Sequence, residues 1–379
     1  MTTREPTDHV DTRSTSNLAA GTYGETGVAV VDAIPASYYT DPKIFELEGK
    51  LIFDKAWQCL GHISMAPKSG DYFTGSIIDQ QIIIARGDDD ILRAFYNVCQ
   101  HRGHQLVEGS GHCRRFVCPY HAWTYNLDGS LKAAPQTKNL PMFNPADIRL
   151  KEIRLETFCG LVFVNMDPEA ASLAQEFGFL EGDIRRTVPN IEQQRLVFEH
   201  PIVHRSNWKA SVENFSECYH CGPVHHYLTA NVIDSASYQL TVAGRSQRHF
   251  IKGRDAALEQ HLWFLWPNTA FGLYPVPGVG MVFCIRNMYP VKFDETIYHY
   301  RWFAAPGIDE TKIVEYATHH AETTGAEDAA VASGAQRGMN SRGFTHGLLF
   351  ANPASSATSE HAIAAFHRWV LDAHSASRP

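Results

Sequence analysis

The sequence predicts an α+β protein in which a small all-β domain precedes a larger domain with helices packed on an antiparallel sheet. Between about residues 59 and 164 the apolar residues alternate with a period of two, in short β-branched or aromatic runs. After Asp167-Pro168 the pattern is mixed, because strand-like runs over 262–302 stand between helix-like segments. Two domains also suit the length of 379 residues.

Four segments follow from these patterns. Residues 1–34 are rich in Thr, Ser, Gly and Asp and are predicted to form a mobile tail. Residues 35–58 are predicted to be a helical lead-in that belongs to the larger domain, since Asp41-Pro42 offers an N-cap and a first-turn proline. The all-β domain takes residues 59–166 and the larger domain residues 167–379.

The individual elements follow the same signals. In the all-β domain, polar turns separate the predicted strands 72–78, 81–86, 92–96, 116–117, 124–126 and 161–164. Residues 184–196 are ambiguous between helix and strand. Helices are predicted over 206–219, 312–339 and 361–373, the last with one apolar face. Antiparallel strands are predicted over 262–302, with turns at Pro267-Asn268 and Pro277-Gly278.

The composition is that of a soluble globular protein, with 44% hydrophobic and 20% charged residues. A net charge of −8 argues against nucleic-acid and anionic-membrane partners, and no run reaches the ~18 apolar residues of a membrane span. The eight cysteines are scattered rather than arranged as a disulfide framework, which indicates a reducing compartment. The first 24 residues lack the apolar core of a signal peptide, so a cytoplasmic location is expected.

The strongest motif is Cys99-x-His101, followed after sixteen residues by Cys118-x-x-His121. Two loops of this kind supply two thiolates and two imidazoles, the ligand set of a Rieske [2Fe–2S] cluster with both cysteines on one iron and both histidines on the other. Gly103 and Gly111 are predicted to bend the chain between the two halves, and Pro119 to rigidify the second loop.

Other interpretations of this motif exist. Two cysteines and two histidines also form a structural zinc site, but zinc spacings usually group like ligands, whereas here Cys and His alternate. A Cys99–Cys118 disulfide would leave both histidines unexplained. Three neighbours, His104, His112 and Cys113, fit neither pattern and are interpreted as loop or core residues.

The second motif lies in Glu217–His226. His220 and His225 are five residues apart, about 140° around a continuous helix, so they could share a metal only if the helix breaks. Gly222-Pro223 is predicted to supply that break, and Glu217 shares a face with His220. Two histidines and one carboxylate form the facial triad of mononuclear non-haem Fe(II) oxygenases. The alternative is an ordinary pair of surface or interface histidines.

From about Ile34 to Leu371 the chain resembles the α-subunit of a Rieske non-haem iron oxygenase. The resemblance rests on Asn207-Trp208-Lys209, Glu213-Asn214-Phe215 and Glu217-Cys218-Tyr219-His220. It implies a catalytic domain of the helix-grip type and makes His220 and His225 iron ligands, with His226 as a minor rival because it replaces the family's proline. It also implies catalytic roles for Asn214 and for Glu217, which takes the place of the family's bridging carboxylate.

The resemblance also implies a third iron ligand far downstream. Glu327-Asp328, followed by Gln336-Arg337-Gly338 and Ser341-Arg342-Gly343, resembles the family's C-terminal ligand helix. Asp328 is the predicted ligand and Glu327 the alternative. Both acids would otherwise simply face solvent on a helix.

The resemblance implies the partners as well. Besides the cluster and Fe(II), the protein would use O₂ and electrons from NADH or NADPH through a separate flavin/iron-sulfur reductase, since no G-x-G-x-x-G follows a strand here. The family forms ring-like homotrimers, in which Glu217 would link His220 to a cluster ligand, His121 of the partner subunit.

The substrate is expected to be a small quaternary ammonium compound of the betaine type, for which Glu217 in place of the more frequent Asp is one sign. Hydroxylation of an N-methyl group would release formaldehyde. An aromatic cage would hold the cation with about 1–2 kcal/mol per ring, and its candidates are Trp263, Trp266, Phe271, Tyr274 and Phe283; these rings could equally be sheet core. Arg245 or Arg248 is the candidate for a substrate carboxylate.

The sequence is also compatible with three other functions. The same metals could hydroxylate or O-demethylate an aromatic acid. A pure electron-transfer Rieske protein would need only about 110 residues, and a zinc-stapled binding module would be colourless.

Overall fold

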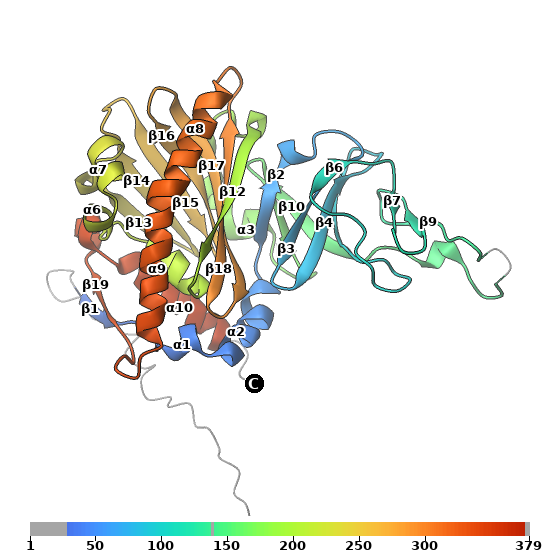
Figure 1. Cartoon of the computed structure of the whole chain (residues 1–379), viewed down its shortest axis with the longest axis horizontal. Helices are drawn as coiled ribbons and strands as arrows, with labels where there is room; N and C mark the ends of the chain where they lie inside the picture. The colour runs from blue at the N-terminus through green and yellow to red at the C-terminus, as the bar shows by residue number, and fades with distance from the viewer. Residues whose placement is uncertain (1–28, 138–139, 376–379) are drawn as a thin grey trace, which may run out of the picture.

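The computed structural model describes residues 29–137 and 140–375, which form a smaller β-rich lobe beside a larger mixed lobe (Figure 1). A seven-stranded antiparallel sheet, in the order β2-β11-β10-β5-β4-β3-β6, builds the smaller lobe. Its strands are β2 (Gln58–His62), β3 (Asp71–Ile77), β4 (Gln80–Arg86), β5 (Leu92–Tyr96), β6 (Ser110–His112), β10 (Glu152–Phe158) and β11 (Leu161–Asn165). A three-stranded sheet follows, made of β7 (Phe116–Val117), β8 (Thr124–Tyr125) and β9 (Leu131–Ala133).

All six strands predicted in the smaller lobe are present to within about one residue. β2, β6, β9 and β10 were not predicted, because β6 is exposed at every position and β10 carries charged residues at alternate positions. Gly111 was expected to bend the chain, yet it lies inside β6, whereas Gly103 does turn the chain, with φ +74°.

A second seven-stranded antiparallel sheet, in the order β12-β18-β17-β16-β15-β14-β13, forms the centre of the larger lobe. Its strands are β12 (Arg195–His204), β13 (Gln239–Ala243), β14 (Ser246–Lys252), β15 (Glu259–Leu265), β16 (Thr269–Val276), β17 (Gly280–Lys292) and β18 (Glu295–Ala304). The strands predicted over 262–302 are confirmed, with both turns in place. The ambiguous segment 184–196 contains the end of a helix and the beginning of β12.

Helices cover this sheet and connect the lobes. The α-helices are α1 (Ser37–Thr40), α2 (Pro42–Glu48), α3 (Leu173–Phe177), α4 (Glu181–Thr187), α5 (Trp208–Phe215), α6 (Cys221–Val224), α7 (His226–Asn231), α8 (Glu310–His320), α9 (Ala326–Met339) and α10 (His361–Ser375). The π-helical turns are η2 (Gly49–Phe53) and η8 (Ala321–Gly325), and the 3₁₀ turns are η3 (Ile63–Met65), η4 (Pro145–Asp147), η5 (Gly178–Leu180), η6 (Ile191–Gln193), η7 (Ser235–Ser237) and η9 (Pro353–Thr358).

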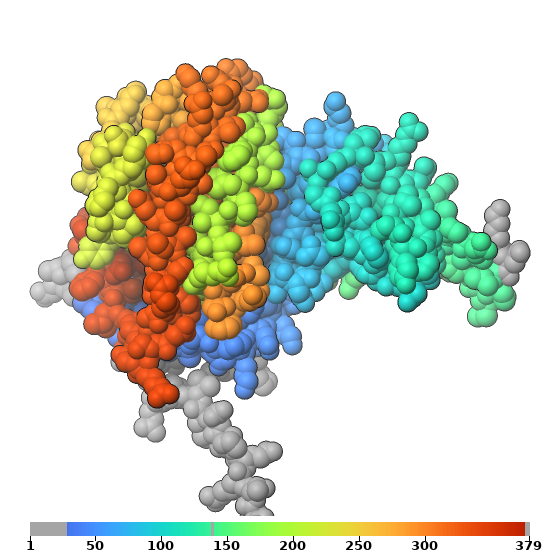
Figure 2. All heavy atoms as spheres, in the orientation of Figure 1, coloured from blue at the N-terminus to red at the C-terminus, as the bar shows by residue number. Residues whose placement is uncertain are grey.

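The predicted helices 312–339 and 361–373 are confirmed as α8-η8-α9 and α10, while 206–219 is helical only over α5. Figures 1 and 2 show α8 and α9 running as one long rod across the front of the sheet, with the smaller lobe projecting to the side.

The large sheet separates two hydrophobic cores because its strands alternate. Leu262 and Phe264 belong to a core that also contains α5, α10 and part of the smaller lobe. Trp263 and Leu265, their neighbours in the chain, point into a second core with α3 and α4. This alternation decides which side chains of the sheet can reach the site described below.

The predicted N-terminal tail is too long. Residues Ala29–Asp32 form β1, which pairs antiparallel with β19 (Leu348–Ala351), and Ile34 is buried. The rest of the predicted tail, residues 1–28, lies outside the described residues. The lead-in contacts the larger lobe through a buried ion pair of 2.6 Å between Glu48 on α2 and Lys209 on α5. In the described part of the chain, no helix is both long and apolar enough to cross a membrane.

Candidate metal centres and the cavity beside them

The two loops of the Cys-His motif have the same backbone structure. In each, the Cys N–H donates to the carbonyl five residues later at 2.8 Å, and the Cys carbonyl accepts from the N–H four residues later at 3.0 Å. The residue that closes each turn is left-handed: Gly103 has φ +74° and Ala122 has φ +57°. Two equivalent turns therefore present Cys99 and Cys118 at equivalent positions.

The histidines of the two loops face each other, and the two cysteines belong to one core cluster of the smaller lobe. The rings of His101 and His121 lie 4.6 Å apart, and the thiols of Cys99 and Cys118 are buried and form no disulfide. The His121 Nδ1 atom is buried without a hydrogen-bond partner. Two buried free cysteines and two neighbouring imidazoles match the donor types of a Rieske [2Fe–2S] cluster, and the Cys99–Cys118 disulfide considered from the sequence is absent.

The second set of donors lies in the larger lobe. Ligand atoms of His220, His225 and Asp328 all lie within 4.8 Å of one another. Asp328 Oδ1 is 3.1 Å from His225 Nε2 and 3.5 Å from His220 Nε2. Two imidazoles and one carboxylate, facing one point from three positions, can hold one metal ion.

The chain reaches this geometry differently from the prediction. The break was expected at Gly222-Pro223, but Pro223 lies in the first turn of α6, where its missing N–H costs no hydrogen bond. The helical path breaks instead at His225, with φ −99° and ψ 68°, between α6 and α7. His220 is the N-cap of α6, so the two histidines flank a single short helix.

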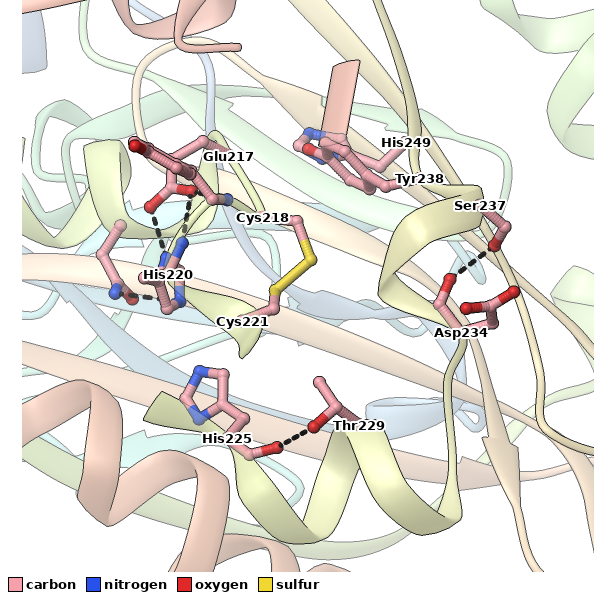
Figure 3. Close-up of a disulfide and its surroundings, with 12 residues drawn as sticks. Glu217, Cys218, His220, Cys221, His225, Thr229, Asp234, Ser237, Tyr238 and His249 are labelled. Carbon is pink, nitrogen blue, oxygen red and sulfur yellow. Dashed lines mark hydrogen bonds and ion pairs between the residues drawn. A yellow bond between two sulfur atoms is a disulfide. The ribbon is translucent and has the colours of Figure 1, made fainter. Parts of the chain in front are cut away.

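Each histidine also has a carboxylate partner on its other ring nitrogen. His220 Nδ1 contacts Glu217 Oε1, and the two side chains point toward each other in Figure 3. His225 Nδ1 lies 2.8 Å from Glu327 Oε2. Such outer partners orient a histidine so that Nε2 faces the metal. Asp328, and not Glu327, therefore lies beside the two Nε2 atoms.

The other predicted residues of this region lie at different depths. Asn214 Nδ2 is 3.4 Å from His220 Nε2, so its amide lies beside the metal-binding atoms. His226 is exposed at the beginning of α7. The structure therefore brings Asn214 into the site and leaves His226 outside it.

The charges of the site are strongly coupled. Burial raises the pKa of Asp328, but hydrogen bonds with both histidines outweigh it and hold that pKa far below its ordinary value. Burial lowers the pKa of His220, yet Asp328 and Glu217 together raise it to about 10. Metal binding must displace these protons, because a ligating imidazole is neutral.

A cavity of about 70 Å³ adjoins the three donors, and five aromatic side chains are among the residues that line it. Its rings are Phe215, Tyr238, Tyr274, Tyr298 and Tyr316. This volume is far below the roughly 300–1,000 Å³ of pockets for drug-sized ligands, so the cavity favours a small substrate.

Four of the five aromatic residues predicted to form a cage do not line this cavity. Only Tyr274 does. Trp263, Phe271 and Phe283 point to the other face of the sheet and lie in the second core. Trp266 packs between the rings of Trp208, Phe366 and Trp369. The prediction counted aromatic residues along the strands, but strand alternation sends neighbours to opposite faces.

The two arginines predicted to bind a substrate carboxylate also lie outside the cavity. Arg248 donates to Asp183 at 2.8 Å and lies over Trp263, and Arg245 is exposed beside Trp266. Sequence reasoning missed Arg286 on β17, which lines the cavity. Its signal was a single cation directly after the apolar run 281–285.

A disulfide next to the metal-binding atoms was not predicted either. Cys218 and Cys221 are bonded between Glu217 and His225, while the other six cysteines are free (Figure 3). Their C-x-x-C spacing was the available signal. The cysteines were expected to be scattered without a disulfide framework, and this single bond is the exception.

A Cys₂His₂ loop pair on a small β-domain and a His₂-carboxylate site on a larger α+β domain define a Rieske-type non-haem iron oxygenase. The Rieske [2Fe-2S] domain family matches residues 56–144, and the ring hydroxylating alpha subunit (catalytic domain) family matches residues 192–260 and 227–376. The chain belongs to this family of oxygenase subunits and is an enzyme. Membership excludes the pure electron-transfer protein and the zinc-stapled binding module.

Among its relatives is the carnitine monooxygenase oxygenase subunit of Escherichia coli K12, 35% identical over 88% of this chain and 91% of the relative. The glycine betaine monooxygenase oxygenase subunit of Chromohalobacter salexigens is 32% identical over 63% of this chain and 53% of the relative. A quaternary ammonium Rieske monooxygenase crystallised with L-carnitine superposes with a TM-score of 0.82 at 32% identity, covering 91% of this chain and 96% of the other. Naphthalene 1,2-dioxygenase from Rhodococcus shares the fold, with a TM-score of 0.79 at 20% identity over 91% of this chain and 95% of the other.

Proposed function

We propose that this protein is the terminal oxygenase of an N-demethylating monooxygenase for small quaternary ammonium carboxylates. The observation that carries the proposal is the convergence of His220, His225 and Asp328 on a small cavity that five aromatic rings help to line. Aromatic faces attract a trimethylammonium group by cation–π interaction. The relatives named for carnitine and glycine betaine support the same substrate class.

The proposed reaction balances with one O₂, two electrons and two protons. One oxygen atom enters a C–H bond of R–N⁺(CH₃)₃ to form R–N⁺(CH₃)₂CH₂OH, and the other leaves as water. The N–CH₂OH bond then breaks with its electron pair on nitrogen while the hydroxyl proton leaves. The products are R–N(CH₃)₂, formaldehyde and a proton.

The residues around the cavity would have three different roles in this reaction. His220, His225 and Asp328 would hold the Fe(II), which supplies O₂ activation when bound. Glu217 and Glu327 orient the two imidazoles through their Nδ1 atoms. The buried rings around the cavity exclude water and keep the reacting methyl group in an apolar environment.

We propose that electrons reach the iron from a neighbouring subunit. Within one chain the cluster loops and α6 lie at opposite ends of the molecule (Figure 1). Glu217 already contacts His220, and the exposed Tyr219 beside it offers a docking surface. A homotrimer would place His121 of the partner subunit against Glu217. The electrons would come from NADH or NADPH through a separate reductase, which favours a cytoplasmic location.

Subunit mixing tests this route. A Cys99→Ser variant cannot hold the cluster and an Asp328→Ala variant cannot hold the iron, so each alone should be inactive. Co-assembled mixed trimers should regain turnover if electrons cross between subunits. Mixed trimers that stay inactive although both metals are present would contradict the route.

The substrate class is tested by O₂ uptake and formaldehyde release with iron-loaded protein, a generic reductase and NADH. We expect formaldehyde to match O₂ uptake with a trimethylammonium carboxylate. Uptake stimulated only by aromatic acids would contradict N-demethylation and support aromatic acid hydroxylation or O-demethylation.

A further inference from the structure

Arg286 is a buried cation without an acidic partner at the wall of the cavity. Its side chain lies on β17 between Cys284 and Met288, on the sheet face that looks toward the metal-binding residues, and the residue is only 9% exposed. Its Nε atom has no hydrogen-bond partner, and among the described residues no carboxylate lies within ion-pair distance of the guanidinium. A buried charge of this kind is costly unless something pairs with it.

The neighbours of Arg286 are aromatic rings. Its guanidinium carbon lies 4.1 Å from the ring centre of Tyr274 and 5.0 Å from that of Tyr300. The hydroxyl groups of both tyrosines are buried and also lack hydrogen-bond partners. Tyr274 lines the cavity together with Arg286, whereas Tyr300 does not. Arg286 also interacts with Tyr298 and Cys284, but both groups are neutral. The Arg286 Nε atom and the Tyr274 hydroxyl are therefore two donors without acceptors among the residues that line the cavity, and a carboxylate has acceptors only.

Two histidines that are not metal ligands, His249 and His320, also line the cavity, and both are expected to be neutral near pH 7. Burial lowers the pKa of His249 to about 3 and that of His320 far below its ordinary value. Arg286 therefore supplies the positive charge of the cavity wall away from the metal-binding atoms.

A second buried arginine shows the contrast. Arg301 on the adjacent strand β18 donates to Asn287 at 2.9 Å and pairs with Glu199 at 3.3 Å. Only 5% of Arg301 is exposed, and the Glu199 carboxylate balances its charge. Arg286, on the cavity face of the same sheet, contacts the neutral Tyr298 and Cys284, and no carboxylate among the described residues pairs with it.

We infer that Arg286, with the hydroxyl group of Tyr274, binds the carboxylate of the substrate and makes a carboxylate a requirement for tight binding. The inference rests on the proposed function and names the residue that would make this site select quaternary ammonium compounds that carry a carboxylate group. Guanidinium and carboxylate form charge-assisted hydrogen bonds, often two in parallel. A cationic alcohol such as choline would instead leave Arg286 unpaired and add a second positive charge to the cavity.

The test compares two ligands that differ only in the carboxylate, γ-butyrobetaine and its methyl ester. Their dissociation constants are measured by calorimetry with the metal-loaded wild-type protein and with Arg286→Gln, Arg286→Lys and Arg245→Gln. Arg245 is the matched control, because it is an exposed arginine that lies over the ring of Trp266 and outside the cavity. The visible spectrum of the cluster checks that each variant is folded.

We expect the wild-type protein and Arg245→Gln to prefer the acid over the ester by about 30-fold or more. Arg286→Gln should abolish the preference by weakening the acid alone, and Arg286→Lys should keep part of it. A wild-type protein without preference, or an Arg286→Gln variant that keeps it, would overturn the inference while leaving N-demethylation intact. Binding of an aromatic acid alone, lost in Arg286→Gln, would overturn the proposed substrate class but support Arg286 as the carboxylate-binding residue.

Discussion

The two candidate metal centres differ in how the chain builds them. At the tip of the smaller lobe, four donors come from two equivalent turns, each with its Cys and His two or three residues apart, and His101 is exposed. In the larger lobe, the donors come from the ends of α6 and from α9, more than a hundred residues away, and His225 and Asp328 are buried.

The difference corresponds to the proposed tasks of the two centres. A cluster that exchanges electrons with a reductase and a neighbouring subunit needs an exposed edge. A site that oxidises a C–H bond needs water to be excluded, and it gains stability from carboxylates that fix each imidazole. In this protein the exposed centre is built from donors close together in the chain, and the buried centre from donors far apart in the chain.

The largest expected effect separates the two centres at the iron ligand. Asp328→Ala should remove the mononuclear iron and lower turnover at least about 100-fold, while the cluster absorbance stays unchanged. Glu327→Gln is the matched variant, one residue away, and should weaken iron binding only about 10- to 100-fold because it loses an orienting partner. Iron content per chain and the visible spectrum measure both effects. If Glu327→Gln lost the iron while Asp328→Ala kept it, Glu327 and not Asp328 would be the iron ligand.

The next effect tests the connection between the centres. Glu217→Gln should leave both metals bound but lower turnover at least about tenfold, because the amide replaces the carboxylate that contacts His220 Nδ1. Metal analysis together with the rate at which O₂ reoxidises the reduced cluster in the presence of substrate measures it. If the variant loses iron and nothing else changes, Glu217 only orients His220 and does not conduct electrons between subunits.

A third comparison concerns stability. Glu48→Gln breaks the ion pair with Lys209, in which both side chains are fully buried, and should lower the free energy of unfolding by about 3–5 kcal/mol. Asp89→Asn breaks a pair with Arg93 at the surface of the smaller lobe and should change stability far less. Denaturant unfolding of the metal-loaded protein compares the two variants. Similar losses in both would mean that the buried pair is not the main contact between the lead-in and the larger lobe.

The smallest effect concerns the paired turns of the cluster. Ala122 adopts φ +57° where the equivalent turn has Gly103, so Ala122→Gly should stabilise the loop by about 0.5–1 kcal/mol. Gly103→Ala should destabilise its loop by a similar amount, although nothing lies within 4 Å of the added Cβ. The urea concentration at which the visible absorbance of the cluster is lost measures the stability change in both variants. A shift in the same direction for both variants would contradict the equivalence of the two turns.

Much of the fold was predictable because its signals are local. The alternation of apolar residues predicted β3, β4, β5 and β11 and most of the second sheet, and the 3.6-residue pattern predicted α8, α9 and α10. β13 and β14 lie before the predicted segment 262–302 and were not predicted. β1 and β12 were also missed, as was the role of Glu48. Their structure depends on partners far along the chain, since β1 pairs with β19 and Glu48 pairs with Lys209.

The sequence by itself determined the donor pairs of the cluster loops, because two and three residues of spacing already bring Cys and His into one turn. It also placed His220 and His225 close together in the chain. The tertiary structure alone decided that Asp328 and not Glu327 faces them, that Tyr274 lines the cavity while Phe271 and Phe283 do not, and that Arg286 does. The physical reason is that periodicity says which side chains share a face, whereas only the packing of helices and sheets decides what that face meets.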